Sequence, residues 1–371
     1  MRQIILAQAI LCLTLSAVAD DLPLSNLNLP SGFSIEIFAR VENARQMTQG
    51  APGVIYVGSR RAGKVHAVID KDGDHRADEV RIIASDLLLP SGLTYRNGDL
   101  FVAAVSTIYR FRDIDSQLDQ PPAPEIVIDT LPDKTHHGWK FIEFGPDGLL
   151  YVPVGAPCNI CLSEDRRFAT ILRMNVDQMP VVPEIYVEGV RNTVGFDWAP
   201  DTGHLWFTDN GRDLMGDDLP PCELNEVTAA GQHFGYPFFH GTGIPDPEFG
   251  KGKKARNYVA PALNLGPHTA PLGMIFYTGS MLPASYRGDA IIAEHGSWNR
   301  TPEAGHTGYR LVHARRDEAG QLHYDVFVDG WLNASNQSWG RPVDLLQLND
   351  GSLLVSDDKA NVIYRISYTD S

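Results

Sequence analysis

Apolar and polar residues alternate along most of the chain in short runs, and a cluster of Gly, Asp, Asn or Pro separates each run from the next. Alternation with a period of two residues is typical of β-strands that bury one face. The pattern of run, turn and second run recurs, and each occurrence predicts an antiparallel hairpin. The hairpins are ARQMTQGAPGVIYVGSR, GLTYRNGDLFVAAV, WKFIEFGPDGLLYVPVG, VGFDWAPDTGHLWFTDNG, LGMIFYTGSMLPASYRGDAIIAEHG and VDLLQLNDGSLLVSDD.

Most hairpins are followed by a further short run, as in GKVHAVID, STIYRFRD, TILRMNV, YRLVHAR and NVIYRISY, and long helical periodicity is absent. Length alone suggests two or three domains. A β repeat of about 40 residues or more overrides that prior and predicts one all-β domain, a six-bladed β-propeller over residues 20–371. We expect the early strand FSIEIFAR to pair into the last blade and close the ring.

The first residues, MRQIILAQAILCLTLSAVADD, combine an arginine, a short apolar run and the small residues Ala17 and Ala19. This pattern predicts a cleaved signal peptide over residues 1–19 and a periplasmic or secreted protein. The formal net charge of −15 argues against nucleic acid or an anionic membrane as the main partner. No later apolar stretch approaches the roughly 20 residues that span a bilayer.

Three cysteines follow the predicted signal peptide: Cys158, Cys161 and Cys222. A c-type haem needs a histidine directly after the second cysteine, but Leu162 stands there, and no βαβ pattern indicates a thioredoxin-like site. An oxidising compartment favours a Cys158–Cys161 disulfide. A bond to Cys222, free thiols and a metal site remain alternatives.

Propeller geometry sorts the loops, because the loop before the first strand of a blade and the loop after its second strand share one face. Before first strands, this face receives Gln46, 89–91, His136, His137, Arg191, Asn192, His268 and 339–341. After second strands, it receives Arg60, Arg61, 158–161, 209–213 and 294–300. Three arginines, Arg191, Arg300 and Arg341, suit carboxylates or phosphates. Because no Gly-rich phosphate loop occurs, a polycarboxylate ligand is the simpler prediction.

The segments HHGWKFIEFGPDGLLYVPVG, GVRNTVGFDWAPDTGHLWFTDNGRD, ELNEV, FGYP, HTAPLGMIFYTG, HGSWNR and GRPVDLLQLNDGSLLVSDD carry a resemblance. Together they resemble the soluble PQQ-dependent sugar dehydrogenases of the glucose/aldose dehydrogenase superfamily, most closely its sorbosone-dehydrogenase-like branch, over residues 22–368. The resemblance implies a six-bladed propeller that holds pyrroloquinoline quinone (PQQ), a tricarboxylate, and Ca²⁺ on one face.

The resemblance also assigns roles to residues. His137 matches the general base that takes the hydroxyl proton while hydride leaves for the quinone, and His136 is its competitor. Arg191 and Asn192 match the cofactor-binding Arg-Asn pair, and Arg341 matches a carboxylate partner. Matching residues in the calcium loop are Gly211 and Arg212, through their backbone carbonyls, although Arg212 stands where the family often has proline.

The chain departs from the glucose dehydrogenases in two places. A lysine of blade five is replaced by HGSWNR, where Trp298 would stack on the quinone and Asn299 or Arg300 would replace the lysine. A glutamine of blade two is replaced near Pro90 and Ser91, so substrate specificity does not transfer.

A separate loop, DKDGDHRADE, is rich in aspartate and predicts either a structural calcium site or a solvated acidic turn on the opposite face. Glycine and glutamate of the EF-hand pattern are missing, because His75 and Arg81 stand at those places. The predicted ligands are Asp70, Asp72, Asp74 and Asp78.

The sequence therefore predicts a PQQ-dependent oxidoreductase that acts on an aldose or a related sugar or alcohol. Because no Cys-x-x-Cys-His motif occurs, the electrons would pass to a separate acceptor, a cytochrome or the quinone pool. Two alternatives stay open: a calcium-dependent hydrolase such as a lactonase, and a binding propeller that has lost its cofactor. A lactonase would need carboxylates and amides around a metal, whereas this chain collects arginines.

Overall fold

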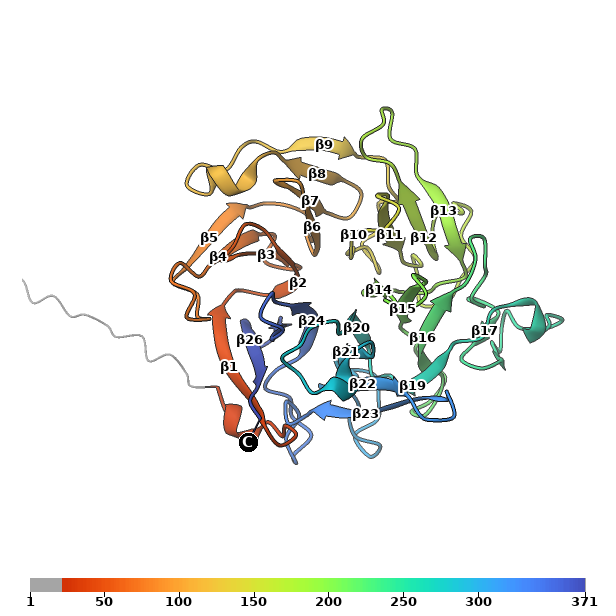
Figure 1. Cartoon of the computed structure of the whole chain (residues 1–371). Helices are drawn as coiled ribbons and strands as arrows, with labels where there is room; N and C mark the ends of the chain where they lie inside the picture. Colours follow the sequence, from red (N-terminus) through yellow and green to blue (C-terminus); the bar gives the residue numbers. More distant parts are fainter. Residues whose placement is uncertain (1–21, 371) are drawn as a thin grey trace, which may run out of the picture.

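The computed structural model describes residues 22–370 and contains six four-stranded antiparallel sheets arranged in a ring (Figure 1). The predicted six-bladed β-propeller is confirmed, whereas the predicted signal peptide at 1–19 lies outside the described residues. Among the described residues, helices are limited to short 3-10 turns at Leu24–Asn26, Ile114–Gln117, Ala255–Asn257 and Ala284–Tyr286. None of these helices is long and apolar enough to cross a membrane.

Each blade begins with an innermost strand, and the strands follow one another outward along the sheet. Blade 1 comprises β2 (Ala44–Gln49), β3 (Val54–Ser59), β4 (Val65–Ile69) and β5 (Glu79–Ala84). Blade 2 comprises β6 (Gly92–Arg96), β7 (Asp99–Ala103), β8 (Ile108–Phe111) and β9 (Glu125–Ile128). Blade 3 comprises β10 (Glu143–Phe144), β11 (Leu150–Val154), β12 (Thr170–Met174) and β13 (Glu184–Glu188).

The second half of the ring repeats this order, with one insertion in blade 4. Blade 4 comprises β14 (Phe196–Trp198), β15 (Leu205–Asp209), β16 (Pro221–Val227) and β19 (Leu263–Pro267). The insertion before β19 contains a small hairpin of β17 (Phe239–His240) and β18 (Ile244–Pro245). Blade 5 comprises β20 (Pro271–Phe276), β21 (Ala290–Glu294), β22 (Arg310–Arg316) and β23 (Leu322–Val328). Blade 6 comprises β24 (Pro342–Gln347), β25 (Leu353–Asp357), β26 (Val362–Tyr368) and the N-terminal β1 (Phe33–Arg40).

The ring closes within blade 6, where strands from both ends of the chain pair. Strand β1 pairs antiparallel with β26, from Phe33 opposite Tyr368 to Arg40 opposite Val362 (Figure 1). The prediction that FSIEIFAR joins the last blade is therefore confirmed.

Apolar side chains fill the spaces between neighbouring blades. Phe101 of β7, for example, belongs to the same buried cluster as Val152 of β11 and Leu172 of β12. Such clusters follow from the alternation, because every second residue of a strand points to the same face. Burial between blades holds the innermost strands, and the loops at their ends, in fixed positions.

Polar side chains also link the innermost strands of different blades. The Oδ2 atom of Asp344 accepts the backbone N–H of Met47 at 2.8 Å, and Asp197 accepts that of Phe276 at 2.7 Å. Gln46 Oε1 accepts the N–H groups of Leu93 and Ile142, each at 3.0 Å. Propeller geometry placed Gln46 on the face that receives the histidines and arginines. In the structure its side chain is buried and is used in these hydrogen bonds between blades.

Candidate functional site

A cavity of about 470 Å³ is lined mainly by loops that precede first strands and follow second strands of the blades. Its lining contains five arginines and one acidic residue, Asp213. The lining residues are Arg45, Arg60, Arg61, His137, Trp139, Arg191, Asn192, Asn210, Gly211, Asp213, Cys222, His268, Ala270, Leu272, His295, Gly296, Trp298, Asn299 and Arg341. Most of the lining residues therefore come from the loops that propeller geometry assigned to this face.

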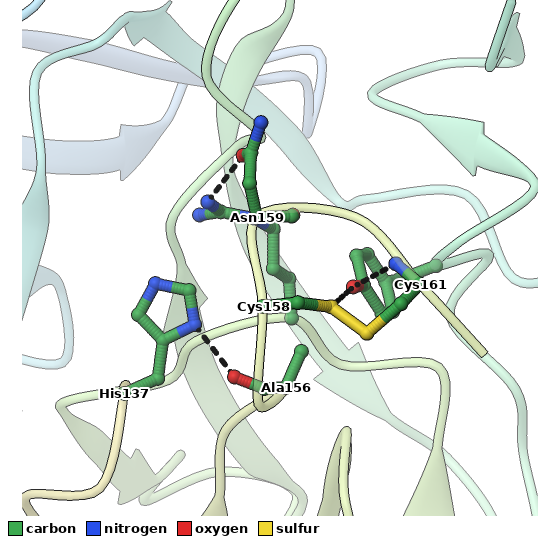
Figure 2. Close-up of a disulfide and its surroundings, with 7 residues drawn as sticks. His137, Ala156, Cys158, Asn159 and Cys161 are labelled. Atoms are coloured by element: carbon green, nitrogen blue, oxygen red, sulfur yellow. Dashed lines mark hydrogen bonds between the residues drawn. A yellow bond between two sulfur atoms is a disulfide. The ribbon is translucent and has the colours of Figure 1, made fainter. Parts of the chain in front are cut away.

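His137 is held at this cavity in one defined tautomer. Its side chain is buried, and Nδ1 lies 2.9 Å from the carbonyl oxygen of Ala156 (Figure 2). Because a carbonyl only accepts, Nδ1 carries the proton and Nε2 carries the lone pair. Burial, and then the charge of Arg191, lower the pKa of His137 well below its usual value. The imidazole is therefore neutral at pH 7 and able to accept a proton.

His136, the competing base, has a different environment. Its ring lies next to that of His137, with centroids 4.1 Å apart, but the residue is exposed and is not part of the cavity lining. The structure therefore separates the two adjacent histidines, which the sequence motif alone does not.

Residues 156–161, which we call the disulfide loop, link His137 to Arg191. The expected Cys158–Cys161 disulfide is present, and the Tyr236 hydroxyl accepts the backbone N–H of Cys161 at 3.1 Å (Figure 2). The carbonyl of Ala156 accepts a hydrogen bond from His137, and Asn159 accepts hydrogen bonds from Arg191. The loop therefore positions two of the predicted site residues.

Arg191 is buried, and all of its side-chain donors have partners within the protein. Nε donates to the Asn159 carbonyl at 2.9 Å, and Nη2 donates to Asn159 Oδ1 and to Asp213. Nη1 donates to the carbonyls of Asn210, at 3.0 Å, and Gly211, at 2.9 Å. The guanidinium thus joins the disulfide loop to the loop after β15, while the side chain of the neighbouring Asn192 lines the cavity.

Other guanidinium groups at the cavity are less fully bonded. Arg341 donates from Nε to the His295 carbonyl at 2.9 Å and from Nη2 to the Gly296 carbonyl at 2.6 Å. Its Nη1 has no hydrogen-bond partner among residues 22–370. Arg60 lies 3.7 Å above the ring of Trp139, and burial together with the charges of Arg45 and Arg61 lowers its pKa to about 10.

The HGSWNR loop contributes two of its three predicted residues to the cavity. Trp298 is 71% exposed and lies at the rim, and Asn299 donates from Nδ2 to Asp213 and to His268 Nδ1. Arg300 lies outside the lining. Its guanidinium donates to the backbone carbonyls of 217, 304 and 305, and we therefore leave it out of the proposed ligand set.

The predicted calcium loop is already bonded within the protein. Nη1 of Arg191 approaches the Gly211 carbonyl, and the side chain of Arg212 pairs with buried Asp246 in the blade 4 insertion. Calcium at the Gly211 carbonyl would have to share this oxygen with a guanidinium.

Three carboxylates of the aspartate-rich loop converge, with oxygens within 4.8 Å of one another. The converging residues are Asp70, Asp72 and Asp78, whereas Asp74 is not part of the group. The backbone N–H of Asp70 bonds the Gly53 carbonyl in the β2–β3 turn, at the end of blade 1 opposite the cavity. A calcium ion in this loop stays a prediction.

Sequence reasoning missed five residues of the lining: Arg45, Trp139, Cys222, Ala270 and Leu272. Arg45 lies next to Gln46 at the start of β2, and Trp139 follows the His-His-Gly motif, so both stood beside residues that were singled out. Cys222 is unpaired and buried, and burial raises the pKa of its thiol to about 11. It therefore stays a neutral thiol at pH 7.

Comparison with known proteins places the chain among sugar dehydrogenases. The family model described as glucose / sorbosone dehydrogenase matches residues 104–297. An uncharacterized protein of Borreliella burgdorferi is 31% identical over 359 residues, which cover 93% of this chain and 91% of the relative.

Solved structures agree on the fold. The PQQ domain of pyranose dehydrogenase from Coprinopsis cinerea has a TM-score of 0.77 at 18% identity, with 92% of this chain and 97% of that chain covered. PQQ-bound aldose sugar dehydrogenase from Streptomyces coelicolor has a TM-score of 0.64 at 18% identity, covering 92% and 100%. The soluble aldose sugar dehydrogenase of Escherichia coli has a TM-score of 0.67 at 15% identity, covering 91% and 100%. With the family match over more than half of the chain, these findings show that the protein belongs to the glucose/sorbosone dehydrogenase family.

Proposed function

We propose that the protein is a quinoprotein that oxidises an aldose or a related sugar or alcohol, with PQQ as hydride acceptor and His137 as general base. One observation carries the proposal: the unprotonated Nε2 of His137 belongs to a cavity that also contains five arginines. Three of these arginines, Arg60, Arg61 and Arg341, form no salt bridge within residues 22–370, and in an acidic chain a polyanionic ligand accounts for them.

The donor set fits a tricarboxylate. Arg60 and Arg341 would hold carboxylate groups, since each has side-chain donors without a partner among the described residues. Asn192 would hold a quinone oxygen, and Trp298 at the rim would contact the ring. When bound, PQQ supplies the two-electron acceptor that the amino acids of this chain lack.

His137 would remove the proton of the reacting hydroxyl, because its Nδ1–H bond to Ala156 fixes the ring and leaves the lone pair of Nε2 free to accept that proton. Arg191 would act as a positioning residue in the cavity wall, where it holds the disulfide loop and the loop after β15 together. Its charge also favours the neutral form of His137 before the reaction.

Calcium remains part of the proposal, with the carboxylate of Asp213 and the backbone carbonyls of loop 209–213 as its oxygen ligands. A calcium ion at Gly211 requires Arg191 to release that carbonyl. We also propose an exported protein that passes electrons to a separate acceptor. The disulfide supports export, because such bonds persist in oxidising compartments.

The test is titration of metal-stripped protein with PQQ and Ca²⁺, followed by dye reduction with aldoses, sorbosone and polyols. We expect micromolar quinone binding and turnover with at least one sugar. Absence of quinone binding would refute the proposal, and hydrolysis of a sugar lactone without quinone would favour the lactonase alternative.

The base is tested with a matched pair of variants. His137→Ala should bind the quinone and lose about 10²- to 10⁴-fold in kcat, because a general base contributes that much. His136→Ala, which changes an exposed neighbour, should stay within a few-fold of wild type. If His137→Ala keeps its turnover and His136→Ala loses it, the base is His136.

A further inference from the structure

A second cavity of about 690 Å³ adjoins the first and is lined by loops of blades 1, 5 and 6. The two cavities share Arg60, Arg61, His295, Trp298 and Arg341. Lys359, which follows β25, lines only the second cavity. A ligand that reaches His137 in the first cavity can therefore extend past Trp298 into the second.

The second cavity contains cations that have no ion-pair partner. Arg60, Arg61, Arg341 and Lys359 all line it, and none of them forms a salt bridge within residues 22–370. Its one acid, Asp358, is already bound by Arg45 at 2.9 Å and by His295 at 2.8 Å. In a chain with a formal net charge of −15, this concentration of unpaired positive charge indicates an anionic ligand.

Hydrogen bonds hold these cations on fixed loops. Asn43 Oδ1 accepts the backbone N–H groups of Arg60, at 2.9 Å, and Arg61, at 2.6 Å. Asn43 Nδ2 donates to the Asp358 carbonyl at 3.2 Å, which joins the loops of blades 1 and 6. Lys359 Nζ donates to the carbonyl and hydroxyl oxygens of Ser338 at 2.6 and 2.7 Å, and its third N–H remains for a ligand.

We propose that the second cavity binds an anionic group of the substrate through Arg61 and Lys359, so that the substrate is a sugar carrying a carboxylate or a phosphate. This inference rests on the proposed function, because the reacting hydroxyl must lie beside His137 in the first cavity. Arg60, Arg61 and Arg341 line both cavities, whereas Lys359 lines only the second. The quinone carboxylates can occupy Arg60 and Arg341, which leaves Arg61 and Lys359 for the sugar.

The first experiment compares dye reduction by protein loaded with PQQ and calcium, using glucose, glucuronate and glucose 6-phosphate. We expect kcat/KM for at least one acidic sugar to exceed that for glucose about tenfold, and this excess to shrink with added salt. The arms with glucuronate and glucose 6-phosphate identify whether the group is a carboxylate or a phosphate.

The second experiment changes one charge. Lys359→Gln should lower the ratio of acidic-sugar to glucose kcat/KM about tenfold, since it removes one charge-assisted hydrogen bond. Lys251→Gln, at an exposed lysine of the blade 4 insertion that lines neither cavity, should leave the ratio unchanged. An equal or higher rate with glucose, together with no effect of Lys359→Gln, would overturn the proposal.

Calorimetric titration with the same three sugars separates this proposal from the proposed function. Binding of an acidic sugar that Lys359→Gln weakens supports the second cavity even if no sugar is oxidised, in which case only the proposed oxidation fails. Turnover of glucose with no measurable binding of either acidic sugar overturns the anion site and leaves the oxidation in place.

Discussion

Two arginines occupy equivalent places in blades 4 and 6. Arg191 and Arg341 each precede the innermost strand of a blade, and each has its backbone N–H bound at 2.8 Å by an aspartate that ends the second strand. Each guanidinium also reaches a loop of the preceding blade, at Asn159 for Arg191 and at His295 for Arg341. The two arginines therefore have equivalent backbone positions, and both guanidinium groups contact the preceding blade.

The two guanidinium groups differ in what remains free. Arg191 has a partner for every side-chain donor, including the Asp213 carboxylate, whereas Arg341 has no carboxylate partner and keeps Nη1 free among the described residues. One motif thus supports two tasks: Arg191 holds loops together, and Arg341 remains available to a ligand. A matching Arg in a family motif therefore identifies a position but not a contact.

The largest expected effect on stability comes from removing Arg191, and removal of Arg341 is the matched comparison. Arg191→Met should lower the free energy of unfolding by about 3–5 kcal/mol, because it leaves buried partners without a donor. Arg341→Met should cost about 1 kcal/mol but weaken quinone binding. Urea unfolding and calorimetric quinone titration measure both effects, with Arg191→Lys as a charge-preserving control. Equal stability losses in the two Met variants would contradict the division of tasks.

Removal of the disulfide should disturb the contacts of Arg191 and leave those of Arg341 unchanged. The double substitution Cys158→Ser and Cys161→Ser opens a short loop, and the chain-entropy model gives a loss of about 2 kcal/mol. We expect kcat to fall as well, since Ala156 and Asn159 lie in this loop and hold His137 and Arg191. If urea unfolding and turnover both match the wild type, the disulfide loop does not position these residues.

A fall in pH should destabilise the surroundings of Arg341 through His295, whose carbonyl accepts a hydrogen bond from Arg341. Burial, despite the nearby Asp358, lowers the pKa of His295 to about 4. The unfolded chain takes up this proton below about pH 6.5 and the folded chain does not, so stability falls as pH decreases from 6.5 towards 4. At pH 5.5 the loss is about 1 kcal/mol.

His295→Gln should remove this part of the pH dependence, because glutamine does not titrate. The measurement is the difference in unfolding free energy between variant and wild type at pH 7 and at pH 5.5. An unchanged difference would mean that His295 keeps an ordinary pKa in the folded protein.

The smallest expected effect concerns Trp298, which lines the same cavity as Arg191 and Arg341. The side chain is 71% exposed, so Trp298→Leu should change the free energy of unfolding by less than about 0.5 kcal/mol. We expect KM to rise while stability stays constant, because Trp298 lines both cavities. A KM equal to that of wild type would remove Trp298 from the binding surface.

Local periodicity was sufficient to predict the fold and the face of each loop, because strand alternation and turn residues are encoded by near neighbours in the sequence. His137 and Arg341 were therefore assigned to the face that carries the cavity. Side-chain direction was not predictable, since it depends on partners distant in the sequence. Gln46 turns inward to the backbone of blades 2 and 3, and Arg300 turns towards residues 217 and 305.

Strand β26 lies between β1 and β25 in blade 6, so the last blade contains strands from both ends of the chain. During synthesis, a nascent chain that lacks this strand leaves two strand edges exposed, and such edges invite pairing with other chains. Ring closure must therefore wait until β26 has been synthesised. Loss of β26 alone would therefore harm the whole protein more than loss of an entire surface loop.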